Sequence, residues 1–241
     1  MTGAPLGEPL AAECGACRRC GLATTRQQVV VGRGDPTARL LLVGEAPGAE
    51  EEACGQPFVG RSGRLLEAML AAAGLNSERD LYIANVIKCR PPGNRKPSRA
   101  EIEACRPWLE RQIGLVRPQL VLLVGATALE ALLGIRGGIT QLRGQWLQLE
   151  GSQGPEQPAP NQASKRQRTP SKRAQGQRMP STKSLIQWPD KEEGGIALMP
   201  LLHPSYLLRN PSEMEGSPRW LTRADLVAVR HRLMMLEPKR E

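Results

Sequence analysis

Four short apolar runs, each ending at a glycine or a polar residue, set the strongest limit on how this chain can fold. They are Leu40–Val43, Tyr82–Ile87, Leu120–Val124 and Ile196–Leu202. Runs of this length that are mostly apolar are typical of parallel strands that are buried on both faces. Stretches of helical periodicity lie between them, so the order of elements predicts an α/β fold with helices on both faces of a parallel sheet.

Capping signals and periodicity place the remaining elements. The other predicted elements are a helix capped by Ser62 and stopped by Gly74, a helix that begins at the Ser98/Glu101 capping box and runs to about Val116, a short helix opened by Thr127 and Glu130, an edge strand at Trp146–Leu149 and a last helix from Thr222.

The predicted sheet also indicates where a ligand would bind. In parallel sheets, ligands bind at the carboxyl ends of the strands, so the loops after Val43, Ile87 and Leu202 are expected to meet at one site.

Positive charge is concentrated in one stretch. The net charge is +9, and the segment from Ser164 to Ser184 supplies seven lysines and arginines without any acidic residue. A basic chain favours a polyanionic partner, nucleic acid first. Because the rest of the chain is only mildly basic, charge supports DNA binding weakly.

The composition changes between residues 151 and 193, where Pro, Gln, Ser, Gly and basic residues dominate. Such a segment buries too little apolar surface to offset its ordering entropy. We therefore expect one domain over residues 1–241 with a disordered basic insertion at about 151–193. No apolar run reaches membrane-spanning length and no secretory signal is present, so the expected location is cytoplasmic, without membrane contact.

Cysteines form the first chemical constellation. Cys14, Cys17 and Cys20 follow a C-x2-C-x2-C pattern, and Cys89 and Cys105 come later. A disulfide framework does not fit a reducing compartment, whereas a set of thiolates suits an iron–sulfur cluster or zinc. Spacing alone does not separate these two, and unrelated buried thiols are a third interpretation.

Polar residues at the predicted strand ends form a second constellation. Glu45 lies in a Gly/Pro-rich loop after the first strand, and Phe58, the single Phe of the chain, follows in the same region. Asn85 interrupts an apolar strand and His203 ends the last one. An aromatic ring, an amide and an imidazole suit a flipped base. Each also has an ordinary explanation: Phe58 as a loop anchor, Asn85 bonded to backbone, and His203 as a turn residue.

The order of four motifs is more specific than any one of them. Cys17-x2-Cys20, GEAPGAEEEACGQPFVGRSGRLL, YIANVIKCRPP and HPSYLLRNP succeed one another along the chain. This series resembles the family 4 (thermostable-type) uracil-DNA glycosylases. The resemblance implies a three-layer α/β/α sandwich around a four-stranded parallel sheet. It also implies a 4Fe–4S cluster on Cys17, Cys20, Cys89 and Cys105, which leaves Cys14 as an extra thiol and Cys54 in a loop.

The resemblance also implies the site residues. Uracil is expected to be held by Glu45, Ala46, Phe58, Asn85 and His203. Glu45 and His203 are the expected catalytic residues, Glu51 is an alternative carboxylate for water activation or thymine exclusion, and we expect Ser205 and Arg209 to contact DNA.

The expected activity is hydrolysis of the bond between uracil and the sugar in single-stranded or mispaired DNA, by a monomer. No Lys lies in the identified motifs to form a Schiff base, so β-elimination is not expected. Two other classes stay open, a non-catalytic lesion-binding or partner-binding protein and an iron–sulfur redox protein.

Overall fold

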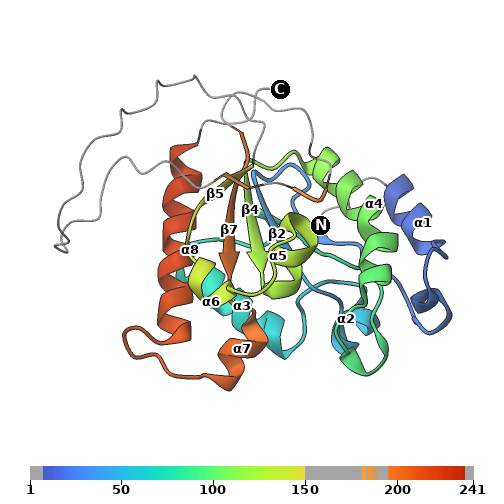
Figure 1. Ribbon diagram of the computed structural model, residues 1–241, viewed down its shortest axis with the longest axis horizontal. Coiled ribbons are helices and arrows are strands. Elements are labelled where there is room, and N and C mark those ends of the chain that lie inside the picture. The colour runs from blue at the N-terminus through green and yellow to red at the C-terminus, as the bar shows by residue number, and fades with distance from the viewer. Residues whose placement is uncertain (1–7, 150–180, 183, 187, 189–194, 237–241) are drawn as a thin grey trace, which may run out of the picture.

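The computed structural model describes residues 8–149, 181–182, 184–186, 188 and 195–236. A sheet runs through the middle of the molecule (Figure 1). Within the described residues it has seven strands, in the order β1-β3-β2-β4-β7-β5-β6. Their bounds are β1 Arg33–Gly34, β2 Leu40–Gly44, β3 Leu81–Asn85, β4 Leu120–Val124, β5 Leu147–Leu149, β6 Ser181–Thr182 and β7 Ala197–Leu201.

The α/β class predicted from the sequence is confirmed, but the sheet is larger than the expected four-stranded parallel one. The central strands β3, β2, β4 and β7 are parallel to one another. The sheet as a whole is mixed, because β1 pairs antiparallel with β3 and β5 pairs antiparallel with β7. Nor is β5 an edge strand, since β6 pairs with its outer side. Strands as short as β1 and β6, with two residues each, carry no periodicity that a sequence pattern can reveal.

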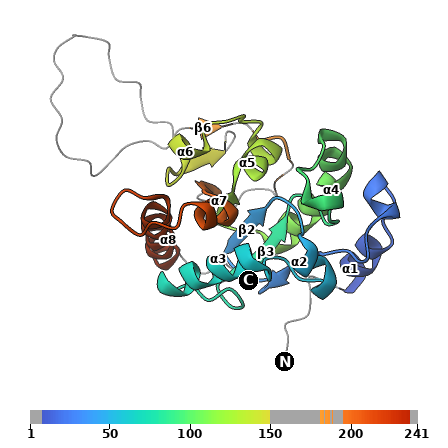
Figure 2. The same ribbon diagram turned by 90° about the horizontal axis from the view of Figure 1, so that it is seen from below.

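Helices cover both faces of the sheet (Figure 2). The helix bounds are α1 Glu8–Gly15, η1 Gly21–Thr24, α2 Ala49–Cys54, α3 Arg61–Ala72, η2 Pro92–Asn94, α4 Arg99–Val116, α5 Ala126–Leu133, α6 Ile139–Leu142, α7 Pro204–Arg209 and α8 Pro218–Met235. Successive strand residues point to opposite faces, so Leu41 and Val43 join the core beneath α1, α4 and α5, whereas Leu40 and Leu42 join the core beneath α3, α7 and α8.

One of the predicted helix starts is confirmed and three are corrected. Ser98 and Glu101 form the expected capping box at the start of α4. The N-cap of α3 is Gly60 instead of Ser62, and α8 begins after Ser217, before Thr222. The N-cap of α5 is Gly125, so the Thr127 hydroxyl is available for another contact.

Most of the predicted basic insertion, 151–193, lies outside the described residues. Six of its residues are described, and these make structured contacts: Ser181–Thr182 form β6, Ile186 is buried and Trp188 packs against the core. No helix in the described ranges is both long and apolar enough to cross a membrane.

Candidate active site

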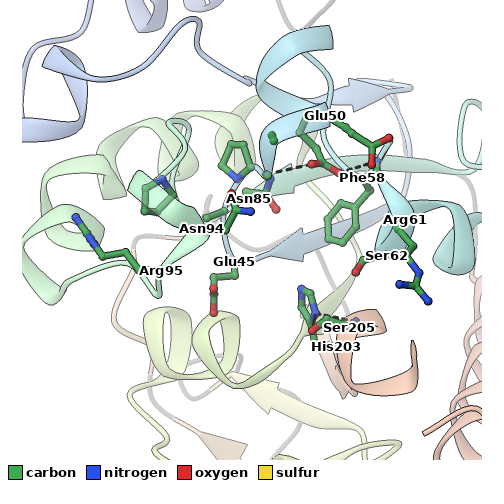
Figure 3. Close-up of a pocket in the computed structure, with 17 residues that line it drawn as sticks. Glu45, Glu50, Phe58, Arg61, Ser62, Asn85, Asn94, Arg95, His203 and Ser205 are labelled. Atoms are coloured by element: carbon green, nitrogen blue, oxygen red, sulfur yellow. Dashed lines mark hydrogen bonds between the residues drawn. The ribbon is translucent and has the colours of Figure 1, made fainter. Parts of the chain in front are cut away.

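The carboxyl ends of the central strands surround a cavity of about 420 Å³. We call it the strand-end pocket. Because the four central strands are parallel, the residues that follow them meet at one edge of the sheet. Glu45 follows β2, Asn85 ends β3 and His203 follows β7, and their side chains lie around the same hollow with Phe58 (Figure 3).

Asn85 is buried in the floor of the pocket, with 2% of its surface exposed. Its amide oxygen, Oδ1, has no hydrogen-bond partner among the described residues. A buried polar atom left unpaired costs free energy, so a native one marks a place where a ligand completes the bond. Gly44 makes room for this arrangement, because a Cβ there would overlap Asn85 Oδ1 and the Phe58 ring.

Phe58 lies in a loop that is held in an unusual conformation. Its φ is 57°, in the left-handed region that most side chains avoid. The Glu51 carboxylate fixes this loop: it accepts hydrogen bonds from the backbone nitrogens of Val59 at 3.1 Å and Gly60 at 2.8 Å, and from that of Gly48 at 3.1 Å. Three backbone bonds occupy this carboxylate, so its contacts are those of a loop anchor.

His203 is held in one tautomer by the start of α7. Its Nδ1 accepts the backbone N–H of Ser205 at 3.1 Å and lies 2.8 Å from the Ser205 hydroxyl. A backbone N–H can only donate, so Nδ1 is unprotonated and the proton of the neutral ring sits on Nε2. Burial lowers the pKa of His203; Glu45 opposes this shift and Arg209 adds to it. A neutral imidazole with an Nε2–H donor therefore faces the pocket.

Glu45 is oriented by Thr127, in the first turn of α5. The Thr127 hydroxyl donates to Glu45 Oε2, and Thr127 is buried, with 3% of its surface exposed. A bond from a buried hydroxyl holds a carboxylate in one rotamer more firmly than solvent does. The predicted cap residue is thus a partner of the predicted catalytic carboxylate.

A second hollow, which we call the cysteine site, is lined by five thiols: Cys14, Cys17, Cys20, Cys89 and Cys105. It lies where the N-terminal segment meets the chain after β3 and helix α4. Burial raises the pKa of Cys14 to about 12 and that of Cys105 to about 11; in both cases Lys88 opposes the shift. Cys54 is exposed and does not line this site.

Donors already point at three of these thiols. Trp108 Nε1 lies 3.3 Å from Cys17 Sγ, the Arg26 guanidinium lies 3.5 Å from Cys89 Sγ, and the Lys88 backbone nitrogen lies 3.3 Å from Cys105 Sγ. Such N–H···S contacts stabilise thiolates. Among the described residues, no three His, Cys, Asp or Glu side chains form a geometry that holds a single metal ion.

Comparison with known proteins decides the family. The model of the Uracil DNA glycosylase superfamily matches residues 31–227. The type-4 uracil-DNA glycosylase of Thermotoga maritima is 37% identical over 197 residues, which cover 81% of this chain and 80% of the relative. The chain belongs to the type-4 uracil-DNA glycosylases.

Two further type-4 uracil-DNA glycosylases align over shorter stretches. That of Pyrobaculum aerophilum is 43% identical over 121 residues, which are 50% of this chain and 61% of the relative. That of Archaeoglobus fulgidus is 47% identical over 113 residues, which are 47% of this chain and 56% of the relative. In these two alignments the chain thus spans less than two thirds of the relative's length.

In this type-4 glycosylase the residues named from the sequence fall into two groups. Glu45, Ala46, Glu51, Phe58, Asn85, His203 and Ser205 line the strand-end pocket, and Cys17, Cys20, Cys89 and Cys105 line the cysteine site. Arg209 lies outside both groups, exposed at the end of α7.

Sequence reasoning missed two residues that connect these sites to their surroundings, Thr127 and Lys88. The sequence pattern at Thr127 predicted a helix cap, so its hydrogen bond with Glu45 was not predicted. Lys88 lies within an apolar and cysteine-containing motif, and its near-complete burial, with 1% exposed, is a tertiary property that no sequence signal indicated.

Proposed function

We propose that this chain hydrolyses the bond between uracil and deoxyribose in DNA, leaving an abasic site. The observation that carries the proposal is the buried Oδ1 of Asn85, which finds no hydrogen-bond partner among the residues described. It lies in a pocket that also holds Phe58, His203 and Glu45. Extruding a base is easiest from single-stranded or mispaired DNA, so these are the proposed substrates. The enzyme is proposed to act as a monomer.

Asn85 is proposed to select the base. Uracil offers an N3–H donor and an O4 acceptor, which match the amide oxygen and the amide NH2 of one Asn. Cytosine offers an acceptor at N3 and a donor at its amino group, so both bonds are lost. A site built to hydrogen-bond its substrate rejects such an analogue strongly, because its buried groups stay unpaired. Phe58 is proposed to stack on the ring.

His203 and Glu45 are proposed to stabilise the two charges that form as the C1′–N1 bond lengthens. The negative charge grows on uracil O2, and the neutral Nε2–H of His203 donates to it, a role of the oxyanion-hole type. The positive charge grows on the sugar, where Glu45, held by Thr127, stabilises it or orients water. The contacts of Glu51 with the loop backbone favour Glu45 for this step.

The cysteine site is proposed to hold a 4Fe–4S cluster on Cys17, Cys20, Cys89 and Cys105. Four thiols around one hollow, with N–H donors aimed at three of them, fit a negatively charged thiolate cluster. When bound, the cluster joins the N-terminal segment to the chain after β3. Ser205 and Arg209 are proposed to contact the DNA beside the pocket.

The test is uracil release from a labelled single strand by the holoprotein, with matched strands that carry thymine or cytosine. We expect release from the uracil strand alone, and Asn85→Asp is expected to alter the base preference. Binding without release would indicate a lesion-binding protein, and redox activity without release would indicate a redox protein. Either result contradicts the proposal.

A further inference from the structure

Lys88 is a buried cation that contacts both sites. Its side chain has 1% of its surface exposed, and its ammonium donates to the backbone oxygen of Asn85 at 2.6 Å. Its own backbone nitrogen lies 3.3 Å from Cys105 Sγ. A buried ammonium has three N–H donors and a full charge, so it costs free energy unless an anion faces it.

The hollow of the cysteine site is lined by Lys88 together with the thiols of Cys105 and Cys14. Burial lowers the pKa of Lys88 to about 8, and these two thiols oppose that shift. Thiolates of a bound cluster would provide the negative charge that the buried ammonium requires. Neutral thiols would not provide this charge, so the buried ammonium is stabilised when the site holds a cluster.

The ammonium of the same lysine contacts the segment that presents Asn85. After β3 the chain continues along β2, with the Val86 nitrogen 2.9 Å from the Gly44 oxygen and the Ile87 nitrogen 3.2 Å from the Glu45 oxygen. The Lys88 side chain folds back over this turn to the Asn85 carbonyl. One residue therefore lies between the thiols and the backbone of the base-selecting Asn.

We propose that Lys88 is a positioning residue that ties the charge of the cysteine site to the placement of Asn85. The inference rests on the proposed function. The thiolates hold the ammonium in place, and the ammonium holds the Asn85 carbonyl, so that the amide stands where the uracil edge arrives. The cluster thereby contributes to base selection without contacting the base.

The experiment compares Lys88→Met with Lys96→Met, both as holoproteins. Met matches the length of Lys without its charge or donors, and Lys96 is an exposed lysine of the same region, with 59% of its side chain exposed and an ion pair to Glu130. We expect Lys88→Met to retain the cluster absorbance and to lose about tenfold in single-turnover uracil release, as for a lost bond from a charged donor. Lys96→Met should stay near wild type. Release by Lys88→Met at the wild-type rate would overturn the proposal.

A second measurement uses the unaltered protein and does not depend on the stability of a variant. Coupling between two sites is reciprocal, so if Lys88 couples them, free uracil that binds near Asn85 acts back on the cluster. We expect uracil to shift the electronic spectrum of the cluster in wild type and, where Lys88→Met is loaded, to leave its spectrum unchanged. A role for Lys88 in packing alone would not produce the shift. If uracil inhibits excision but leaves the wild-type spectrum unchanged, the inference fails; if wild type releases no uracil, the proposed function fails.

Discussion

The strand-end pocket and the cysteine site lie at the two ends of one short segment, from Asn85 to Cys89, and they treat their polar atoms in opposite ways. In the pocket, Asn85 Oδ1 is buried without a hydrogen-bond partner in the part of the chain that the structure describes. In the cysteine site, N–H donors already face the sulfurs of Cys17, Cys89 and Cys105.

The difference follows from how long each site holds its ligand. A transient base must find groups that water has not satisfied, since recognition depends on completing bonds that are otherwise missing. A resident cluster carries permanent charge, so the chain surrounds it with fixed donors. An unpaired buried atom therefore indicates a site for a ligand that binds and leaves, and a set of fixed donors indicates a site for a ligand that stays bound.

The largest effect is expected from removing one proposed cluster ligand of the cysteine site, with removal of the extra thiol, Cys14, as the control. Cys89→Ala should remove a cluster ligand, and the holoprotein should lose iron, its brown colour with absorbance at roughly 400 nm, and activity. Cys14→Ala should keep all three, because Cys14 lies beside the proposed ligand set. Iron analysis and absorbance of both variants decide this. A colourless, zinc-loaded wild type with full activity would show that the site holds a different metal.

A smaller effect is expected from loosening the pocket without touching a group that contacts uracil. Thr127→Val keeps the shape of the side chain and removes the bond to Glu45, so we expect about tenfold slower single-turnover release. The double variant with Glu45→Gln should be little slower than Glu45→Gln alone, because the two residues act as a unit. Fully additive losses would mean that Thr127 does not act through Glu45.

The third effect concerns pH. Burial holds the pKa of His203 below its ordinary value of 6.5, so the ring stays neutral in the folded protein at pH values where the unfolded chain already binds a proton. Stability should therefore decline as the pH falls below about 6.5 and level off below the folded-state pKa. The release rate should hold to a pH below 6.5 for the same reason. A rate profile with its acidic midpoint at or above 6.5 would contradict a neutral His203.

The smallest effect is expected from the basic segment, which lies outside the described residues. The sequence from 152 to 178 carries six lysines and arginines and one acidic residue. Replacing these six by Gln at constant length should weaken DNA binding by about threefold and reduce its salt dependence, because fewer counterions are released. The single-turnover rate at saturating enzyme should not change. If the salt dependence of DNA binding is unchanged, the segment is a spacer that does not contact DNA.

Sequence patterns predicted the central strands well because their runs are mostly apolar. They also predicted that the loops after these strands meet at one site, because strand ends in a parallel sheet converge. The Ser98/Glu101 box was also predictable, since capping is local in sequence. Two kinds of feature were not. The strands β1 and β6 are too short to show a period, and the Thr127 bond joins residues that lie far apart in the chain.

Burial was the other missing quantity. A lysine in a sequence is normally exposed, so nothing local distinguished Lys88 from Lys96. In the predicted basic insertion, likewise, composition gave no sign that Ile186 is buried. In each case a tertiary contact overrode a preference that the sequence pattern expressed locally.

The central claim is that the strand-end pocket performs the chemistry, and His203 tests it most directly. In His203→Ala, single-turnover release from a uracil-containing single strand at saturating enzyme should fall by about a hundredfold to a thousandfold, as for a lost oxyanion donor. Affinity for the same strand should stay close to wild type, because His203 acts on charge that develops during the reaction. A near-normal rate would contradict the account, even though the chain belongs to the uracil-DNA glycosylases.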